Sequence, residues 1–232
     1  MMNMVVHVPH ASIEIPEAYR EPFLLSGEEL LVEATPSADL HTDALAHEAW
    51  PEASIVPASV SRIVCDVERY SDDAKEPMAA RGRGMIYIAT HDGKPLRRQL
   101  SAVERIAIQR EVYDPHWEKL RAAAAGGVLV DLHSYPAARW PIETVSSEAV
   151  RPEIDLGTDP ELTPASWRDA LVRHFEKLGF ETAINTPYAG VIDAGARAAV
   201  MIEIRRDVLG DPSDHARWSR VVRALAGLPL PT

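Results

Sequence analysis

Short apolar runs alternate with longer amphipathic segments along most of the chain. Runs rich in valine, isoleucine and leucine, each bounded by proline, glycine or charged residues, predict strands at about 4–8, 54–57, 61–66, 84–89, 127–132, 181–184 and 199–205. Segments with helical periodicity predict helices at about 26–34, with Ser26 as N-cap, and at 39–49, 95–124, 163–178 and 212–226. Strands that alternate with helices of this length need crossover connections. We therefore expect a three-layer α/β/α sandwich with a mostly parallel central sheet.

Three of the predicted strands end in side chains that suit a reactive site. The first ends at His10, the fifth runs through Asp131 to His133, and the last carries Glu203. The carboxyl ends of parallel strands meet at one edge of a sheet, and open α/β proteins bind ligands there. Two imidazoles and a spare carboxylate are parts of a catalytic zinc site, which needs three protein ligands and a base beside a water. A lone histidine is more often an ordinary core or surface residue, so the hypothesis depends on the three occurring together.

The third metal ligand is less well defined by the sequence. Asp39, His41 and Asp43 cluster at the start of a predicted helix, where the positive end of the helix dipole favours carboxylates. Asp39 is explained by helix capping alone. Asp43 lies one turn further in, where capping no longer explains it, so it is a candidate ligand, although the spacing leaves Asp39 and His41 open.

Arginines accompany two of the predicted strands. Arg62 and Arg69 flank the run 61–66, with Asp66 between them. Guanidinium groups suit a bidentate grip on a carboxylate or the stabilisation of an oxyanion, and the equal alternative is a structural salt bridge to Asp66. On the last strand, alternation places Glu203 and Arg205 on the same side. Glu203 is therefore either the ion-pair partner of Arg205 or a general base.

Length and composition narrow the class of protein. The chain has 232 residues of which 46% are hydrophobic, which suits one large α/β domain over residues 1–232. A formal charge of −11 argues against a nucleic-acid or acidic-membrane partner and favours a small-molecule ligand. There is no signal-peptide pattern at the start, no run of about 20 apolar residues, and a single cysteine, Cys65. We therefore expect a cytoplasmic protein without a membrane anchor.

Six motifs, spread in order over most of the chain, resemble the N-formylglutamate amidohydrolase family. They are Pro9-His10-Ala11-Ser12 with Ile15-Pro16, an acidic helix start with a recurrent aspartate that falls on Asp43, Ser61 to Arg69, His133-Ser134, Asn185-Thr186-Pro187-Tyr188-Ala189-Gly190, and Glu203 to Val208. The family's fold is akin to that of zinc carboxypeptidases and aspartoacylases, a phosphorylase/hydrolase-like arrangement. One motif alone is weakly specific, whereas six in register are fairly specific.

The resemblance implies a metal-dependent hydrolase that cleaves the amide bond of an N-formyl or N-acyl amino acid. It implies Zn²⁺, or another divalent metal, held by His10, Asp43 and His133. It implies Glu203 and Arg62 as catalytic residues and Arg69, Arg205, Tyr188 and Asn185 as substrate-binding residues. Glu68 stands where the family has asparagine, which adds a negative charge and leads us to expect a substrate other than N-formylglutamate itself. The alternative is a catalytically degenerate relative that binds a metal or small ligand, with Glu203 locked to Arg205.

Overall fold

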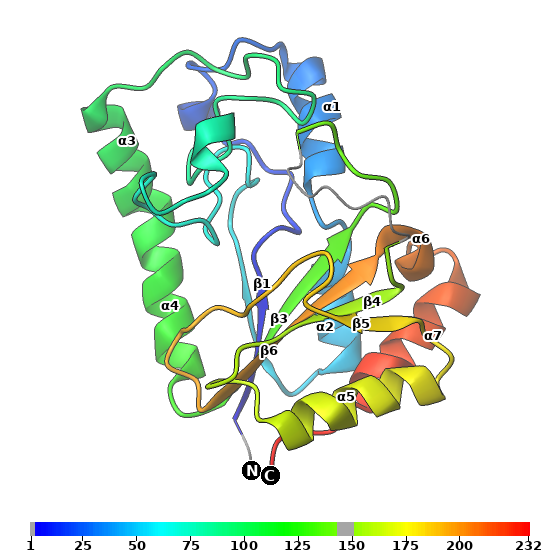
Figure 1. The fold of residues 1–232 in the computed structure, drawn as a ribbon. Coiled ribbons are helices and arrows are strands. Elements are labelled where there is room, and N and C mark those ends of the chain that lie inside the picture. Colours follow the sequence, from blue (N-terminus) through cyan, green and yellow to red (C-terminus); the bar gives the residue numbers. More distant parts are fainter. Residues whose placement is uncertain (1–2, 143–150) are drawn as a thin grey trace.

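A six-stranded sheet forms the centre of the computed structural model, which describes residues 3–142 and 151–232. The strands are β1 (Met4–Val8), β2 (Ser54–Pro57), β3 (Val128–Tyr135), β4 (Ile154–Gly157), β5 (Thr182–Ile184) and β6 (Ala198–Arg205), in the order β2-β1-β3-β6-β4-β5. Every neighbouring pair is parallel except β4 and β6. The predicted α/β sandwich with a mostly parallel sheet is confirmed (Figure 1).

Helices cover both faces of this sheet. Residues of α2 (Thr42–Ala49), α5 (Ala165–Lys177), α6 (Arg206–Leu209) and α7 (His215–Ala226) pack on one face, and residues of α4 (Asp114–Ala124) pack on the other. The remaining helices, α1 (Gly27–Ser37) and α3 (Ala102–Ile108), bury their apolar residues beyond the sheet. The cap predicted at Ser26 is confirmed as a reciprocal capping box with Glu29. Within the described residues, no helix is long and apolar enough to cross a membrane.

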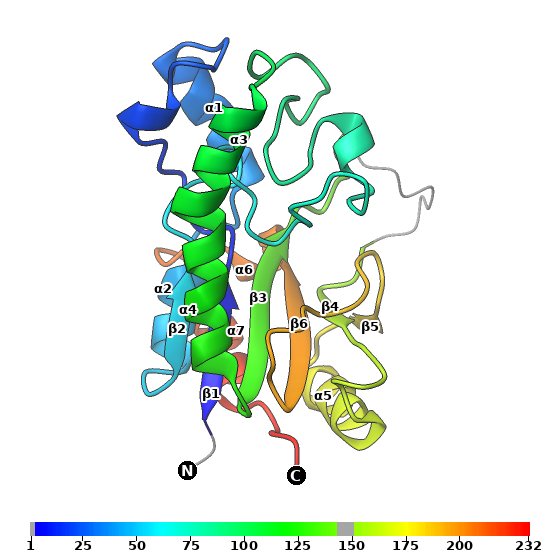
Figure 2. The same cartoon turned by 90° about the vertical axis from the view of Figure 1, so that its left-hand side faces the viewer.

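The two faces of the sheet differ in what covers them. Even-numbered positions of β1, β3 and β6 pack with α2, α5 and α7 in one hydrophobic cluster, and we call this side the three-helix face. Odd-numbered positions at the amino-terminal ends of the same strands pack with α4, and we call this side the α4 face. Figure 2 shows α4 lying along its side of the sheet. Successive strand residues point to opposite faces, so each strand contributes to both layers.

The long helix predicted over 95–124 is shorter and irregular. Residues 95–100 are not helical, and the helix begins at Ala102 with Ser101 as its cap. The helix then passes through a π-helical segment, Gln109–Tyr113, before α4 begins. Pro115, in the first turn of α4, has no N–H to donate to a carbonyl in the preceding turn, which favours a change of helical register there.

The strands predicted at 61–66 and 84–89 are wrong. Their apolar residues are buried, but in a separate cluster that includes Ile63, Val64, Met85 and Tyr87 and lies outside the sheet. A short apolar run records burial, and it does not by itself distinguish a strand from a buried loop. This cluster belongs to the upper part of the molecule in Figure 1, beyond the carboxyl ends of the strands.

One strand lies inside the segment between the predicted strand 127–132 and the predicted helix 163–178. β3 extends to Tyr135, and β4 forms at Ile154–Gly157, where it pairs with β5 and β6. Residues 143–150 of this segment lie outside the described residues. The missed strand is only four residues long and carries a buried aspartate, Asp155, so its sequence lacks a continuous apolar run.

Candidate active site

Three buried side chains from separate parts of the chain meet at the carboxyl edge of the sheet. His10 follows β1, His133 lies on β3, and Asp39 lies in the connection between α1 and α2. The backbone N–H of Asp39 donates to the carbonyl oxygen of His10 at 2.8 Å, which fixes this connection against the end of β1. All three residues are nearly inaccessible, at 2% exposed for His10, 3% for Asp39 and 2% for His133.

The three side chains converge through atoms that can bind a metal. His10 Nδ1 and His133 Nδ1 are 3.3 Å apart. Asp39 Oδ2 is 3.2 Å from His133 Nδ1 and 3.5 Å from His10 Nδ1. Ligands about 2.0–2.1 Å from a tetrahedral zinc ion lie roughly 3.3 Å from one another. The three side chains therefore fit the chemistry and the spacing of a zinc site.

Carboxylates lie beside the far ring nitrogens of the two histidines. His10 Nε2 is 2.9 Å from Asp66 Oδ1. His133 Nε2 lies 3.0 Å from Asp131 Oδ1 and 3.2 Å from Glu68 Oε1, without an aligned hydrogen bond to either. A carboxylate on the far nitrogen of a ligating histidine orients the ring and raises its basicity, as outer partners do in zinc proteins.

Asp39 is held in its ionised form. Burial alone would raise the pKa of this carboxyl, but the hydrogen bonds of His10 and His133 and the charge of Arg206 hold it well below its usual range. Arg206 donates from Nη2 to Asp39 Oδ1 at 3.1 Å, on the carboxylate oxygen that does not face the histidines. The oxygen Oδ2 is therefore left for the converging site.

Glu203 lies beside this group on the neighbouring strand. It is the register partner of His133 in the β3–β6 pairing, and its side chain is buried. Burial raises the pKa of Glu203 to about 8, assisted by the charges of Asp39 and Glu68 and opposed by His133. Its Oε2 has no hydrogen-bond partner among the described residues. A buried carboxyl with a raised pKa and an unpaired oxygen suits a group that accepts and returns a proton.

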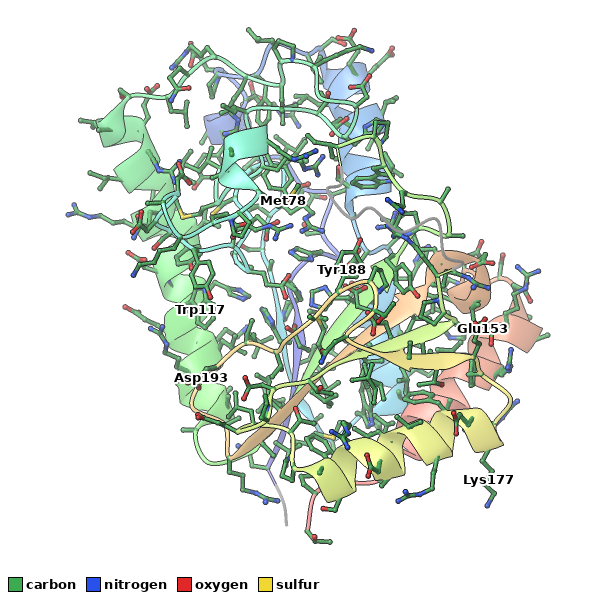
Figure 3. The ribbon with its side chains drawn as sticks, in the orientation of Figure 1. Met78, Trp117, Glu153, Lys177, Tyr188 and Asp193 are labelled. Atoms are coloured by element: carbon green, nitrogen blue, oxygen red, sulfur yellow. The ribbon has the colours of Figure 1, made fainter. Side chains whose placement is uncertain are left out.

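These residues open into a cavity of about 1170 Å³. Its lining comes from the sheet edge, from α4 and from the loops above, and includes Arg62, Arg69, Tyr87 and Tyr188. Figure 3 labels four of the lining residues: Met78 before the short helix Ala79–Arg81, Trp117 on α4, and Tyr188 and Asp193 in the connection from β5 to β6. A concave site with aromatic walls and a few convergent polar groups is typical of small-molecule binding.

Four of the six predicted catalytic and substrate-binding residues line this cavity, namely Glu203, Arg62, Arg69 and Tyr188. Arg62 donates from Nε and Nη2 to Asp66 Oδ2 at 3.0 and 2.7 Å, and from Nε to the Tyr87 hydroxyl at 3.0 Å. Burial alone would lower the pKa of Arg62, but the charge of Asp66 raises it, so this arginine stays charged. Arg69 lies 3.6 Å from Asp66 and from Glu76. Tyr188 is held by its backbone N–H, which donates to Asp155 Oδ2 at 2.9 Å.

Three predicted site residues lie elsewhere. Asp43 is exposed on α2 and belongs to none of the groups of side chains that could bind a metal in the described chain. Asp39 lies beside the two histidines, where Asp43 was predicted to lie. Arg205 bonds Asp207 at 2.7 Å rather than Glu203, and it does not line the cavity. Asn185 is exposed, and its amide oxygen accepts from the backbone of Thr158 and Gly190. Asn185 therefore shapes the loop that carries Tyr188 and does not face the cavity.

A signal for Asp39 was present in the helical period. The buried residues of α2 are Thr42, Leu45, Ala46 and Ala49, which places Asp43 on the opposite, solvent face. The capping interpretation of Asp39 was wrong, because the N-cap of α2 is His41, with a φ of 68°. Arg206 was missed because the alternation argument stopped at Arg205, whereas the chain turns into α6 at the next residue.

The fold and the convergent ligands define an α/β protein with a candidate metal site at the carboxyl edge of its sheet. A family model described as N-formylglutamate amidohydrolase matches residues 2–209. No curated protein matches the sequence. The chain belongs to the N-formylglutamate amidohydrolase family.

Two solved structures share this fold. The crystal structure of N-formylglutamate amidohydrolase from Ralstonia eutropha JMP134 aligns with a TM-score of 0.81 and 22% identity, over 98% of this chain and 91% of the other. A gene product of Agrobacterium tumefaciens aligns with a TM-score of 0.73 and 20% identity, over 98% of this chain and 88% of the other. At these identities the likeness concerns the fold.

Proposed function

We propose that this protein is a zinc-dependent amidohydrolase that cleaves an N-formyl or N-acyl amino acid. The observation that carries the proposal is the convergence of His10 Nδ1, His133 Nδ1 and Asp39 Oδ2 at separations of 3.2–3.5 Å, with the unpaired carboxyl of Glu203 on the next strand. Family membership supplies the class of reaction, hydrolysis of an amide bond. The proposed metal ligands are therefore His10, Asp39 and His133.

The residues around the site divide the work of hydrolysis. His10, Asp39 and His133 would hold a divalent cation, which would supply Lewis acidity to the amide carbonyl and to water near neutral pH. Glu203 accepts the proton of the attacking water and delivers it to the leaving nitrogen, a task that suits its raised pKa. Arg62 keeps its positive charge at the cavity wall, where it stabilises the developing negative charge on the carbonyl oxygen.

Substrate recognition falls to the remaining lining residues. Arg69 and Tyr188 face the cavity and offer a cation and a hydroxyl to the amino-acid part of the substrate. Glu68, with its side chain 22% exposed, lines the cavity and adds a carboxylate 3.2 Å from His133 Nε2. This extra charge supports a substrate whose charges differ from those of N-formylglutamate.

The matched pair Asp39→Asn and Asp43→Asn tests the metal site. We expect about one zinc per chain in the wild type and in Asp43→Asn. Zinc affinity should fall in Asp39→Asn by more than the roughly 10–100-fold that is typical when a residue supporting a metal ligand is lost. Metal analysis and release of formate or acid from a panel of N-formyl and N-acyl amino acids give the readout. Equal zinc content in the two variants would contradict the proposed ligand set, and a zinc-loaded wild type inactive on the whole panel would contradict the activity.

The degenerate alternative receives no support from the geometry. It required Glu203 to be locked in an ion pair with Arg205. In the described part of the chain Arg205 pairs with Asp207, and no ion pair joins it to Glu203.

A further inference from the structure

A buried polar chain leads away from the candidate metal site on the α4 face. The odd-numbered positions of β1 and β3 begin with apolar residues, Val5 and Leu129, and continue with His7, Asp131 and His133. His7 and Asp131 are 0% exposed, and His116 of α4, which packs over them, is 8% exposed. The proposed chemistry uses His133 and leaves the other three without a role.

The contacts along this chain are short, and all but the one to His133 are hydrogen bonds. Asp131 Oδ1 is 2.8 Å from His7 Nδ1, and it lies 3.0 Å from His133 Nε2 without an aligned hydrogen bond, so one oxygen lies within reach of two imidazoles. The other ring nitrogen of His7, Nε2, is 2.8 Å from His116 Nε2. The order is therefore His116, His7, Asp131 and His133, from the inner side of α4 to the proposed ligand.

Burying these groups is costly unless they serve one another. An unpaired polar group in a protein interior is destabilising, and an apolar pair like Val5 and Leu129 would fill the same layer of the sheet without that cost. The β1–β3 pairing itself needs only backbone groups at His7 and Asp131. The side chains are therefore not explained by the fold.

Donor and acceptor rules fix the protons along the chain. Asp131 Oδ1 lies within reach of both imidazoles, and a carboxylate oxygen only accepts hydrogen bonds. His7 therefore carries a proton on Nδ1, and in its neutral form Nε2 is an acceptor. His116 then donates from Nε2. His116 is neutral because burial lowers its pKa to about 3.

We propose that His7, supported by His116, is a positioning residue for the metal site. It holds Asp131 so that this carboxylate keeps the His133 proton on Nε2 and leaves Nδ1 directed at His10 and Asp39. The inference rests on the proposed metal site and is independent of the substrate. Removing His7 frees the Asp131 oxygen to rotate, and Glu68 then competes for His133 Nε2 from 3.2 Å.

Two variants of matched shape separate positioning from packing. In His7→Asn the amide nitrogen stands near the place of Nδ1 and donates to Asp131, whereas His7→Leu has similar volume and no donor. We expect His7→Leu to bind zinc about tenfold more weakly than wild type and His7→Asn to stay within about threefold, as for other outer partners of ligating histidines. Chelator competition measures zinc affinity, and ¹⁵N shifts of the His133 ring in the zinc-loaded protein report which nitrogen carries the proton.

The outcomes separate this inference from the proposed function. Equal zinc affinity in the Asn and Leu variants, whether reduced or unchanged, would overturn the positioning role, because a structural role lowers stability without distinguishing a donor from a methyl group. Should His7→Leu fail to fold, His116→Gln, which keeps a donor for His7, and His116→Met, which does not, give the same comparison. Wild type with no zinc affinity would overturn the proposed function together with the inference.

Discussion

The two faces of the central sheet are built from the same three strands and do different work. On the three-helix face every even-numbered position of these strands except Ser134 is apolar, from Val6 and Val8 on β1 through Leu132 on β3 to Ile204 on β6. On the α4 face the amino-terminal half is apolar, and the carboxyl-terminal half carries the histidines and acids of the candidate site. The contrast shows how one strand anchors the fold with one side and presents reactive groups with the other.

The largest expected effect belongs to the α4 face. Glu203→Gln removes the group that accepts the proton and should lower the rate of amide hydrolysis by about 10²–10⁴-fold, while zinc content stays at the wild-type level. Arg205→Gln, two residues away and paired with Asp207, is the matched control and should stay within a few-fold of wild type. Steady-state kinetics with metal analysis decides; comparable losses in both variants would contradict the role given to Glu203.

A change on the three-helix face should act on stability instead. Leu132 is 0% exposed and adjacent to His133 in sequence, and Leu132→Ala should lower the free energy of unfolding by about 3–5 kcal/mol. The folded fraction should keep its zinc and its activity per molecule, because the cavity left lies across the sheet from the site. Denaturant unfolding and activity below the transition measure both quantities. Lost zinc with little lost stability would break the separation of the two faces.

The smallest effect concerns how the stability of the metal-free protein depends on pH. Burial raises the pKa of Glu203 from 4.5 to about 8. Between these values the folded state keeps a proton that the unfolded state releases, so stability is greatest below the lower pKa and falls as pH rises. From pH 5 to pH 7, we expect the wild type to lose about 2 kcal/mol of unfolding free energy relative to Glu203→Gln. A constant difference would show that Glu203 is ionised in the folded protein.

Much of the architecture is a local property of the sequence. The short apolar runs of β1, β3 and β6 predicted both the strands and the ends at which His10, His133 and Glu203 lie. The strand predictions failed in two places. The apolar residues at 61–66 and 84–89 are buried away from the sheet. The strand β4 was missed because a buried aspartate interrupts its apolar run. Hydrophobicity reports burial, whereas strand pairing depends on a distant partner.

The sequence by itself determined which strand ends carry imidazole and carboxylate, because strand period and strand direction are encoded locally. Only the tertiary structure decided that Asp39, and not Asp43, meets the two histidines, since a hydrogen bond to the His10 carbonyl brings the α1–α2 connection to the end of β1. The tertiary structure also decided that Glu203 lies beside His133 and His7 beside Asp131. The register between strands that are far apart in the chain is set by packing on both faces of the sheet.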